Sequence, residues 1–467
     1  MAAEKLPKEL VISALIMVFG MFPLMLDSTI VNVAVNSLAG VFSTNLAVIQ
    51  WAVTGYVLAT GVAVPFSGWL MQKYHGKHLF IISMCMFLVG SLLSGLSWSA
   101  GSLIVFRVLQ GFAAGILLPT FTTLIVRMAG QDNLGRLMSL VSIPVVLGPI
   151  LGPIIGGLIM EFTTWHWLFF VNLPIGIIGI ILIQRRLPLF EAENRSIKLD
   201  WLGVALLAVA SGALIYGITQ VVTADGYAIG VISLIIGSAA FVAYAFYALK
   251  KKNGALIPLN IFRSKNFSAS FVSLFLTGFA LSGPMLLLPL FFQDVMGLSV
   301  ISSALWLVPQ GVGMLIVRPF IGKLTDRIGA RYVVLPSIIL TVIGTLPFVF
   351  FNSNSSAIII WAVLLVRGMG VGGYMIPIMS DSFVGLERSQ VPAASVATRI
   401  IQNVGAAFGA AVLATTVSSA IIVLAGNFTG AYHEGFTVSL IFTLIGIIPA
   451  LFLTNKLGKK KAVQSKA

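Results

Sequence analysis

Long apolar runs separated by short polar breaks constrain this chain more than any other feature. Many runs continue for about 20 residues, the length that a helix needs to cross a bilayer core about 30 Å thick. Only 9% of the 467 residues are Asp, Glu, Lys or Arg, whereas a soluble domain carries about a quarter. The sequence therefore excludes an ordinary water-soluble fold and predicts an all-α integral membrane protein.

The runs predict fourteen transmembrane helices. The expected spans are 10–32, 48–72, 78–98, 101–126, 134–160, 165–184, 199–220, 227–250, 267–292, 300–322, 331–351, 356–380, 394–424 and 436–455. The first run continues past the length of a signal peptide and has no small-residue cleavage site, so we expect it to remain as the first span.

The distribution of basic residues tests this count, because Lys and Arg concentrate in cytoplasmic loops. With a cytoplasmic N-terminus, no basic residue falls in an outer loop. The four outside the cytoplasmic segments lie within spans and are Arg107, Arg318, Arg367 and Arg399. An odd number of spans would move whole basic clusters outside. The sequence thus predicts a multi-pass protein of the plasma or bacterial inner membrane with both termini in the cytoplasm.

Several function classes are excluded by what the sequence lacks. The net charge of +14 is spread between apolar runs and not along one face, so we expect no nucleic-acid partner. The single cysteine, Cys85, lies in an apolar run, and neither a metal site nor a disulfide is expected. No phosphate-binding Gly-x-x-x-x-Gly-Lys-Ser/Thr loop and no catalytic constellation occur. We expect no enzyme and no cofactor, and an ion gradient as the energy source.

The chain repeats itself at separations between 254 and 260 residues. Three pairs of stretches carry the repeat: Gly68–Lys77 with Gly322–Arg331, Arg107–Gly115 with Arg367–Gly372, and Gly148–Gly152 with Gly405–Gly409. Two six-helix halves around a central site are the layout of an alternating-access carrier. The expected parts are an N-terminal six-helix bundle over 1–190, two inserted helices with linkers over 191–262, and a C-terminal six-helix bundle with a basic cytoplasmic tail over 263–467.

Asp27 is the only acidic residue well inside a predicted span. An acid at mid-membrane costs about 2.5–3.5 kcal/mol on insertion scales, and such residues usually face a bundle interior or a watery cavity. Burial favours the neutral carboxyl, which makes Asp27 a candidate proton carrier. The alternative is a carboxylate that ties the first span to a neighbouring backbone or arginine. Acids at span ends, such as Asp200 and Asp294, are expected to be solvated.

Arg107 is the candidate partner of Asp27. Each lies six residues from the outer end of its span, so at 1.5 Å per residue both are about 9 Å deep. If they pair, Arg107 favours the ionised carboxylate and regulates proton release; the alternative is a purely structural ion pair. Gln110, one turn below Arg107, is a further candidate for the central cavity, together with Gln310 and Arg367.

Glycine and proline recur in the fifth span. The run contains Gly148, Pro149, Gly152, Pro153, Gly156 and Gly157. Glycines at every fourth position form a smooth face for close helix packing, and the prolines remove backbone donors and allow bending. Such a helix suits a moving gate, although small-residue packing is common in any membrane bundle.

A candidate cytoplasmic gate lies between the tenth and eleventh spans. The expected loop Gly322–Arg331 contains Asp326, Arg327, Gly329 and Arg331. An acid–base cluster there can latch helix ends together in one conformational state. The alternative is that these charges only set the topology. The first-half copy has Gln72 in place of Asp326, so it lacks the acid.

These motifs together resemble the signature motifs of the major facilitator superfamily, and the glycine–proline run is similar to the motif associated with antiporters. Three further stretches resemble fourteen-helix drug:proton antiporters, typified by bacterial multidrug exporters: Leu26–Asn32, Gln50–Tyr56 and Trp165–Pro174. The resemblance covers essentially the whole chain. In the first-half loop, Gln72 and His75 replace the usual Asp and Gly. Span 10 has Gln310 but no acid of the kind that some dication exporters carry.

The resemblance implies proton-coupled efflux, with the Asp27 position in proton or cation handling and the Arg107 position in coupling. We expect a monomer that exports amphipathic, lipophilic cationic or neutral drugs, as in antibiotic resistance. Its partners would be the small-molecule substrate, protons and membrane lipids. Two alternatives stay open: an exporter of one endogenous lipid or metabolite, and a membrane sensor that has kept the fold without transport.

Overall fold

The computed structural model describes residues 7–44, 46–130, 133–191, 198–221, 226–251 and 254–455, and these residues form helices joined by short connections. The helices of the first half are α1 (Lys8–Ile30), η1 (Val31–Ala34), α2 (Val35–Val41), α3 (Leu46–Lys73), α4 (Gly76–Gly95), α5 (Ala100–Ala129), α6 (Leu134–Phe162), α7 (Trp167–Phe170) and α8 (Asn172–Arg186). Two helices follow, α9 (Trp201–Gln220) and α10 (Tyr227–Lys251).

The second half begins with η3 (Leu259–Arg263). Its other helices are α11 (Lys265–Asp294), α12 (Val300–Trp306), α13 (Val308–Ile328), α14 (Arg331–Thr345), η4 (Leu346–Val349), α15 (Ala357–Asp381), η5 (Arg388–Gln390), α16 (Val391–Val423), α17 (Phe428–Ile445) and α18 (Ile447–Ala450).

Twelve helices within the described residues are long and apolar enough to cross a membrane. The 29-residue α6 and the 21-residue α13 are not among the twelve. α13 carries Arg318 at its middle and three further charged residues near its end, which lower its hydropathy. The multi-pass architecture is therefore confirmed, and the number fourteen stays a prediction.

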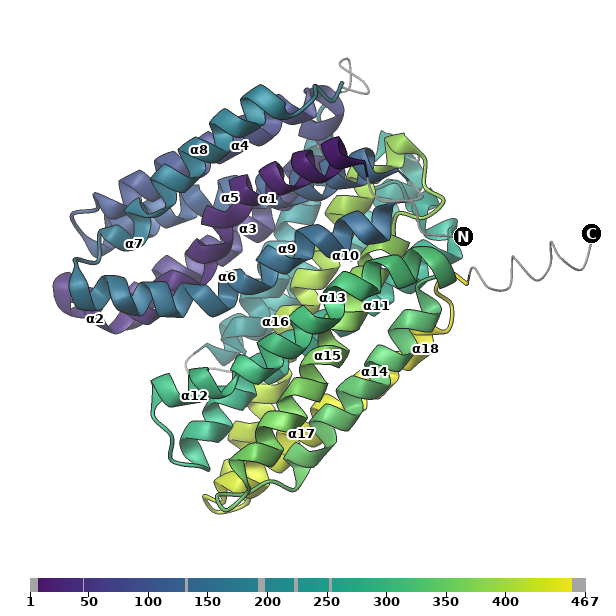
Figure 1. Cartoon of the computed structure of the whole chain (residues 1–467). Helices are drawn as coiled ribbons and strands as arrows, with labels where there is room; N and C mark the ends of the chain where they lie inside the picture. The colour runs from purple at the N-terminus through teal and green to yellow at the C-terminus, as the bar shows by residue number, and fades with distance from the viewer. Residues whose placement is uncertain are drawn as a thin grey trace, which may run out of the picture.

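Two helical bundles and a separate hairpin make up the molecule (Figure 1). In the first bundle α3 and α4 pack on α5, and α1 packs on α6 and α8. In the second, α11 packs on α16, and α13 and α14 pack on α15. The hairpin of α9 and α10 contacts α3 of one bundle and α16 of the other. The hairpin therefore contacts both bundles, through α9.

The bundles meet chiefly along two crossings, α6 with α13 and α3 with α16, and α5 also contacts α16. The contacts between them lie near the ends of these helices on the side where α1 begins and α18 ends, and the bundle axes diverge away from it (Figure 1). Gly322 packs against the backbone of Gly135, and Thr123 Oγ1 donates to Ser395 Oγ at 2.8 Å. We call this side the closed end.

The expected loop Gly322–Arg331 is wrong in its extent. α13 continues to Ile328, and only Gly329 and Ala330 separate it from α14. The charged residues after Gly322 extend the helix beyond its apolar part, because neither glycine nor proline interrupts it before Gly329, which ends it at a φ of 95°. The first-half copy behaves alike, with α3 continuing to Lys73.

Candidate functional site

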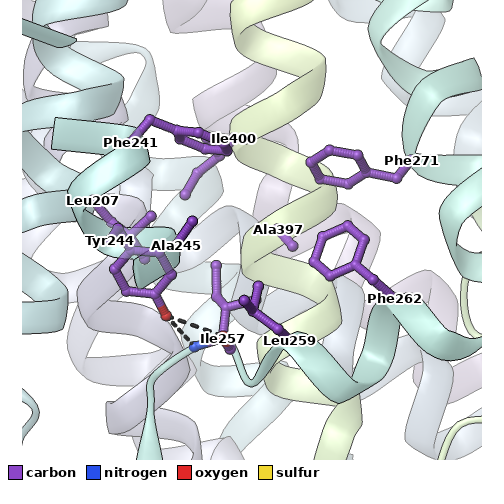
Figure 2. Close-up of a pocket in the computed structure, with 10 residues that line it drawn as sticks. All are labelled: Leu207, Phe241, Tyr244, Ala245, Ile257, Leu259, Phe262, Phe271, Ala397 and Ile400. Carbon is purple, nitrogen blue, oxygen red and sulfur yellow. Dashed lines mark hydrogen bonds between the residues drawn. The ribbon is translucent and has the colours of Figure 1, made fainter. Parts of the chain in front are cut away.

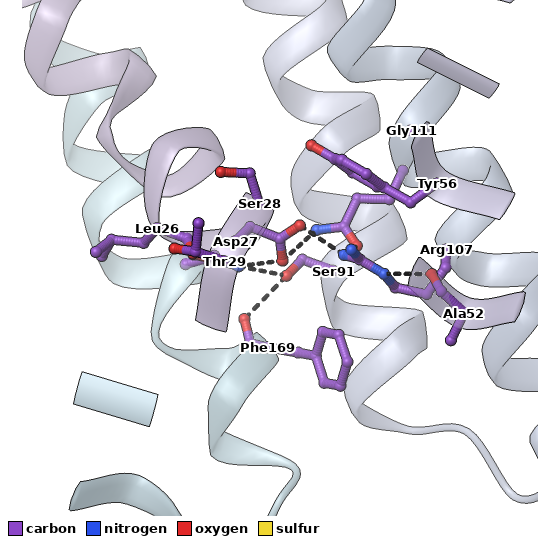
Figure 3. A network of polar contacts seen from close by, with 12 residues as sticks. Leu26, Asp27, Ser28, Thr29, Ala52, Tyr56, Ser91, Arg107, Gly111 and Phe169 are labelled. Carbon is purple, nitrogen blue, oxygen red and sulfur yellow. Dashed lines mark hydrogen bonds and ion pairs between the residues drawn. The ribbon is translucent and has the colours of Figure 1, made fainter. Parts of the chain in front are cut away.

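Asp27 lies near the end of α1 and its side chain is completely buried. The carboxylate accepts three hydrogen bonds, two from α5 and one from α8. Arg107 Nη1 donates to Oδ2 at 2.5 Å, while Gln110 Nε2 and Asn172 Nδ2 donate to Oδ1 at 3.0 and 3.1 Å. The pairing that equal depth permits is thus present (Figure 3). Within the described residues, the carboxylate oxygens therefore accept only from N–H donors, one of which belongs to a charged guanidinium.

Arg107 projects from α5 and is 2% exposed. Besides Asp27, its Nη1 donates to Gln110 Oε1 at 2.8 Å, and its Nε donates to the Ala52 carbonyl at 3.3 Å. The guanidinium carbon lies 4.2 Å from the centroid of the Tyr56 ring, a cation–π distance. Arg107 is therefore held on several sides, and within the described residues Asp27 supplies the only negative charge among its partners.

Asn172 and Ser91 extend the network toward α4 and α8. Asn172 Nδ2 also donates to Ser91 Oγ at 3.0 Å, and Ser91 Oγ donates to the Phe169 carbonyl at 2.9 Å. Asn172 Oδ1 is buried and has no hydrogen-bond partner within the described residues. The amide beside Asp27 thus keeps one free acceptor, which becomes relevant if the carboxyl takes up a proton.

The glycine run on α6 places this helix directly against the segment that follows Asp27. A Cβ built on Gly152 would overlap Thr29 Oγ1, and one built on Gly156 would crowd Ile30. Gly157 faces open space. The side chains of Gly148, Pro149 and Pro153 lie outside those that the structure describes. The run therefore brings α6 into close contact with α1 near the buried carboxylate.

The second half has a buried arginine but a different set of partners. Arg367, 1% exposed, donates from Nη1 to Gln310 Oε1 at 2.5 Å, from Nε to Thr345 Oγ1 at 3.2 Å and from Nη2 to the Ala280 carbonyl at 3.3 Å. All three acceptors are neutral. Gln310 and Arg367 are thus brought together, and they lie apart from the Asp27 network, which is formed by first-half helices.

The close helix contacts correct the alignment of the two halves. Gly90 packs on the backbone of Gln110, and Gly344 packs in the same way on the backbone of Arg367. The structural counterpart of Arg367 is therefore Gln110, and the repeat of Arg107 by Arg367 that the sequence suggested is wrong by about one helical turn. The repeat in the sequence aligned two arginines, whereas in the structure the helix contacts of the two halves align at their glycines.

Asp326 binds the first residues of α6 at the closed end. Its Oδ1 accepts the N–H of Gly135 and its Oδ2 the N–H of Arg136, each at 2.9 Å, and Arg136 Nε lies 3.6 Å from Oδ2. A carboxylate at a helix N-terminus satisfies free N–H groups and complements the helix dipole. Asp326 therefore joins the second bundle to the first.

The other members of the predicted gate have separate environments. Arg327 is exposed, and the Arg331 N–H donates to the Thr454 carbonyl at 3.2 Å. Below Asp326, Ser139 Oγ donates to the Arg318 carbonyl, and Arg318 Nη1 donates to the Ser142 carbonyl. The gate thus consists of one carboxylate with Arg136 beside it, and of hydrogen bonds to backbone carbonyls.

Among the residues that the structure describes, the related crossing of α3 with α16 has no such bond. Gly68 packs on Val396 just as Gly322 packs near Ser139. Gln72 stands at the position of Asp326, and α16 begins with Val391 and Pro392, where proline has no N–H to donate. At the α3–α16 crossing, an amide side chain therefore replaces the carboxylate, and a proline stands at the start of the facing helix.

Sequence reasoning missed Tyr56, Ser91 and Asn172. Asn172 was a detectable signal, because it is an amide residue within the apolar stretch Trp165–Pro174. The described part of the chain contains no group of three or more His, Cys, Asp or Glu that could hold a metal ion.

Comparisons with known proteins agree with this architecture. The "Multidrug resistance protein B homolog" of Mycobacterium tuberculosis (strain ATCC 25618 / H37Rv) is 31% identical over 398 residues, which are 84% of this chain and 73% of that protein. The lincomycin resistance protein LmrB of Listeria monocytogenes serovar 1/2a is 27% identical over 440 residues, 91% of this chain and 93% of that protein.

Solved structures share the fold at low sequence identity. The human organic anion transporter MFSD10 superposes with a TM-score of 0.67 at 14% identity, covering 95% of this chain and 100% of that one. The proton:xylose symporter XylE gives a TM-score of 0.64, also at 14% identity, over 95% and 94% of the chains. Residues 17–410 match the Major Facilitator Superfamily. With that match over most of its length, and with a relative at 31% identity, the chain belongs to the Major Facilitator Superfamily of membrane transporters.

Proposed function

We propose that this protein is a proton-coupled antiporter that exports amphipathic compounds by alternating access. The observation that carries the proposal is the buried Asp27 carboxylate, held by Arg107, Gln110 and Asn172 between helices of one bundle. Relatives named for multidrug and lincomycin resistance support export of small molecules. We also propose fourteen spans, with α6 and α13 added to the twelve, and both termini in the cytoplasm.

In this mechanism Asp27 carries the proton. Protonation removes the charge that holds Arg107 and requires an acceptor for the new O–H group. Rotation of the Asn172 amide would bring its unpartnered Oδ1 to the place of Nδ2, 3.1 Å from Asp27. Arg107 keeps Gln110 and Ala52 as acceptors when the ion pair is lost. Asp27 can thus take up the proton while Arg107 keeps two hydrogen-bond acceptors.

The buried charges favour neutral over cationic substrates, the two kinds that the resemblance implies. Asp27 is already paired, and Arg318, Arg367 and Arg399 make no ion pair with a described carboxylate. A cationic compound entering the interior would meet this excess of positive charge in a medium that screens it weakly. A neutral amphipathic compound meets no such repulsion.

Proton release from inverted vesicles tests the proposal. A panel of neutral and cationic dyes and antibiotics is added to native protein and to Asp27→Asn, with Glu161→Gln as a control because Glu161 is exposed at the end of α6. We expect native protein and Glu161→Gln to release protons, most strongly with neutral compounds, and Asp27→Asn to release none. Coupling retained by Asp27→Asn would remove Asp27 from the mechanism.

The same panel separates the two alternatives. An exporter of one endogenous lipid or metabolite would respond to a single compound class and give no protection against unrelated dyes. A sensor that has lost transport would give no substrate-driven proton movement even with the native sequence.

A further inference from the structure

A cavity of about 220 Å³ lies between the α9–α10 hairpin and the second bundle (Figure 2). Its walls come from five separate elements. They include Leu207 of α9, Phe241 of α10, Phe262 of η3, Phe271 of α11 and Ile400 of α16. The cavity is distant in sequence from Asp27 and shares no residue with the network around it, so proton coupling does not account for it.

The lining accepts only apolar groups. Tyr244 supplies its one side-chain hydroxyl, which donates to the Ile257 carbonyl at 3.1 Å and accepts the Ile257 N–H at 2.7 Å (Figure 2). Both functions of the hydroxyl are therefore in use. A polar ligand would lose its hydrogen bonds to water without replacement, and water itself is disfavoured in an apolar cavity. A hydrocarbon chain meets neither penalty.

The cavity lies at a shallow depth on the side of the closed end. Leu207, Phe271 and Ala397 are each the seventh residue of their helices, counted from that end. At 1.5 Å per residue they are about 9 Å from the helix starts, the depth of the first part of a lipid acyl chain. Phe241 is 40% exposed, so the cavity reaches the outer face of the bundle.

Exposed basic residues lie close in sequence to the lining of the cavity. Arg263 directly follows the lining residue Phe262, Lys265 lies two residues further, and Lys250 is in the last turn of α10, the helix that carries Ala245. All three are exposed and form no ion pair within the described residues. Basic residues just beyond the apolar part of a helix attract anionic headgroups.

We propose that this cavity binds one acyl chain of an anionic phospholipid from the leaflet at the closed end, with its phosphate at Arg263 and Lys265. The chain fills the space between the inserted hairpin and the second bundle. Because α16 forms one wall and also meets α3 across the bundle interface, the lipid links the hairpin to a moving part of the transporter.

Photocrosslinking tests this site in the full-length protein. Protein is reconstituted with phosphatidylglycerol that carries a diazirine on its acyl chain, and crosslinked peptides are mapped. We expect labelling to concentrate in residues 241–271. Ala245→Phe, which fills the cavity, should abolish this labelling, whereas Ala239→Phe on the exposed face of the same helix should retain it.

The headgroup is tested separately. Arg263→Gln with Lys265→Gln should lower labelling about thirtyfold, since each basic residue contributes about 1 kcal/mol, and Lys323→Gln on α13 should leave it unchanged. Phosphatidylcholine with the same chain should label weakly. Equal labelling in Ala245→Phe and Ala239→Phe, or equal labelling by both lipids, would overturn the proposal. So would displacement of the lipid probe by a transported dye, which would make the cavity a substrate site.

Discussion

The three donors around Asp27 have one consequence at the scale of single residues: a protonated Asp27 would need a hydrogen-bond acceptor in the place of one of them. Arg107, Gln110 and Asn172 each place an N–H on a carboxylate oxygen, and no contact within the described part of the chain places an acceptor there. In the proposed orientation the closed end faces the cytoplasm. The conformation is then the one in which Asp27 awaits a proton from outside.

A double-substitution cycle separates the structural role of the ion pair from its role in coupling. Arg107→Gln leaves a buried carboxylate without its cation and should lower the free energy of unfolding by about 3–5 kcal/mol. Adding Asp27→Asn removes the orphaned charge and should restore much of that stability. We expect neither the single nor the double variant to exchange protons, as measured in vesicles alongside thermal unfolding in detergent. Exchange recovered together with stability would show that the pair is only structural.

The sequence could place Asp27 beside Arg107 because depth follows from counting residues along two helices. Asn172 and Tyr56 could not be found in this way. Their contacts depend on how α8 and α3 are rotated about their axes, and that rotation is set by packing at glycines such as Gly111, whose Cβ position is occupied by the Tyr56 backbone. For the same reason, the sequence repeat paired Arg367 with Arg107, whereas the helix contacts pair it with Gln110.

At the scale of helices, the two crossings between the bundles differ by one carboxylate. Asp326 holds the start of α6, and the Gln72 crossing has no equivalent bond. Hydropathy predicted both crossings' helices well. It ended the tenth span too early, because charged residues such as Lys323 end an apolar run without ending a helix. The sequence predicted a latch in a loop. In the structure, the same residues lie at the end of α13, and Asp326 caps the start of α6.

Removing the Asp326 carboxylate should open the closed end more often. Loss of a cap and of its charge is worth about 1.4 kcal/mol, a tenfold change in the population of the open state. In a Cys85→Ser background, a cysteine at the buried Ser395 reports opening by its rate of thiol labelling. We expect Asp326→Ala to speed labelling about tenfold. Arg327→Ala, at the exposed neighbour, should not, and equal rates in both would exclude a latch.

Asp200 joins the inserted hairpin at its base, and its expected solvation is wrong. The carboxylate, 7% exposed, caps α9 through Gly203 N–H at 3.1 Å and accepts from Lys251 Nζ at 2.8 Å, from the Tyr247 hydroxyl and from Leu256 N–H at 3.2 Å. Burial raises the pKa of Asp200, but the hydrogen bonds from Lys251, Tyr247 and Gly203 together lower it further, to below its ordinary value of 3.8.

This lowered pKa predicts how the hairpin responds to acid. Folding stabilises the ionised form, so the contribution is complete above pH 3.8 and is lost as the pH falls through the lower folded value. Asp200→Asn keeps a capping side chain and removes the charge. We expect its unfolding temperature to lie below that of native protein at neutral pH and to approach it below pH 3.8. A difference that is constant with pH would assign the effect to packing.

At the scale of the whole molecule, the internal repeat predicted two related bundles, and the matched crossings of α6 with α13 and of α3 with α16 agree with it. The α9–α10 hairpin has no counterpart in the repeat, so its place beside both bundles could not be derived from symmetry. Because the hairpin contacts α3 and α16, a rocking motion of the two bundles must either move the hairpin or make the bundles slide past it. The proposed lipid lies at that junction.

Side-specific labelling decides between twelve and fourteen spans, because α6 and α13 are the two helices in question. In a Cys85→Ser background, single cysteines replace Asn133 and Thr163 at the two ends of α6. Two others replace Ser299, which precedes α12, and Arg327, near the end of α13. If both helices span, an impermeant thiol reagent labels Thr163→Cys and Ser299→Cys from outside the cell, and Asn133→Cys and Arg327→Cys only after lysis. Labelling of both ends of one helix from the same side would show that it does not cross. Since each crossing reverses the side of every later loop, a single such helix would also place the basic clusters that follow it outside, against the distribution of charge that defines the topology.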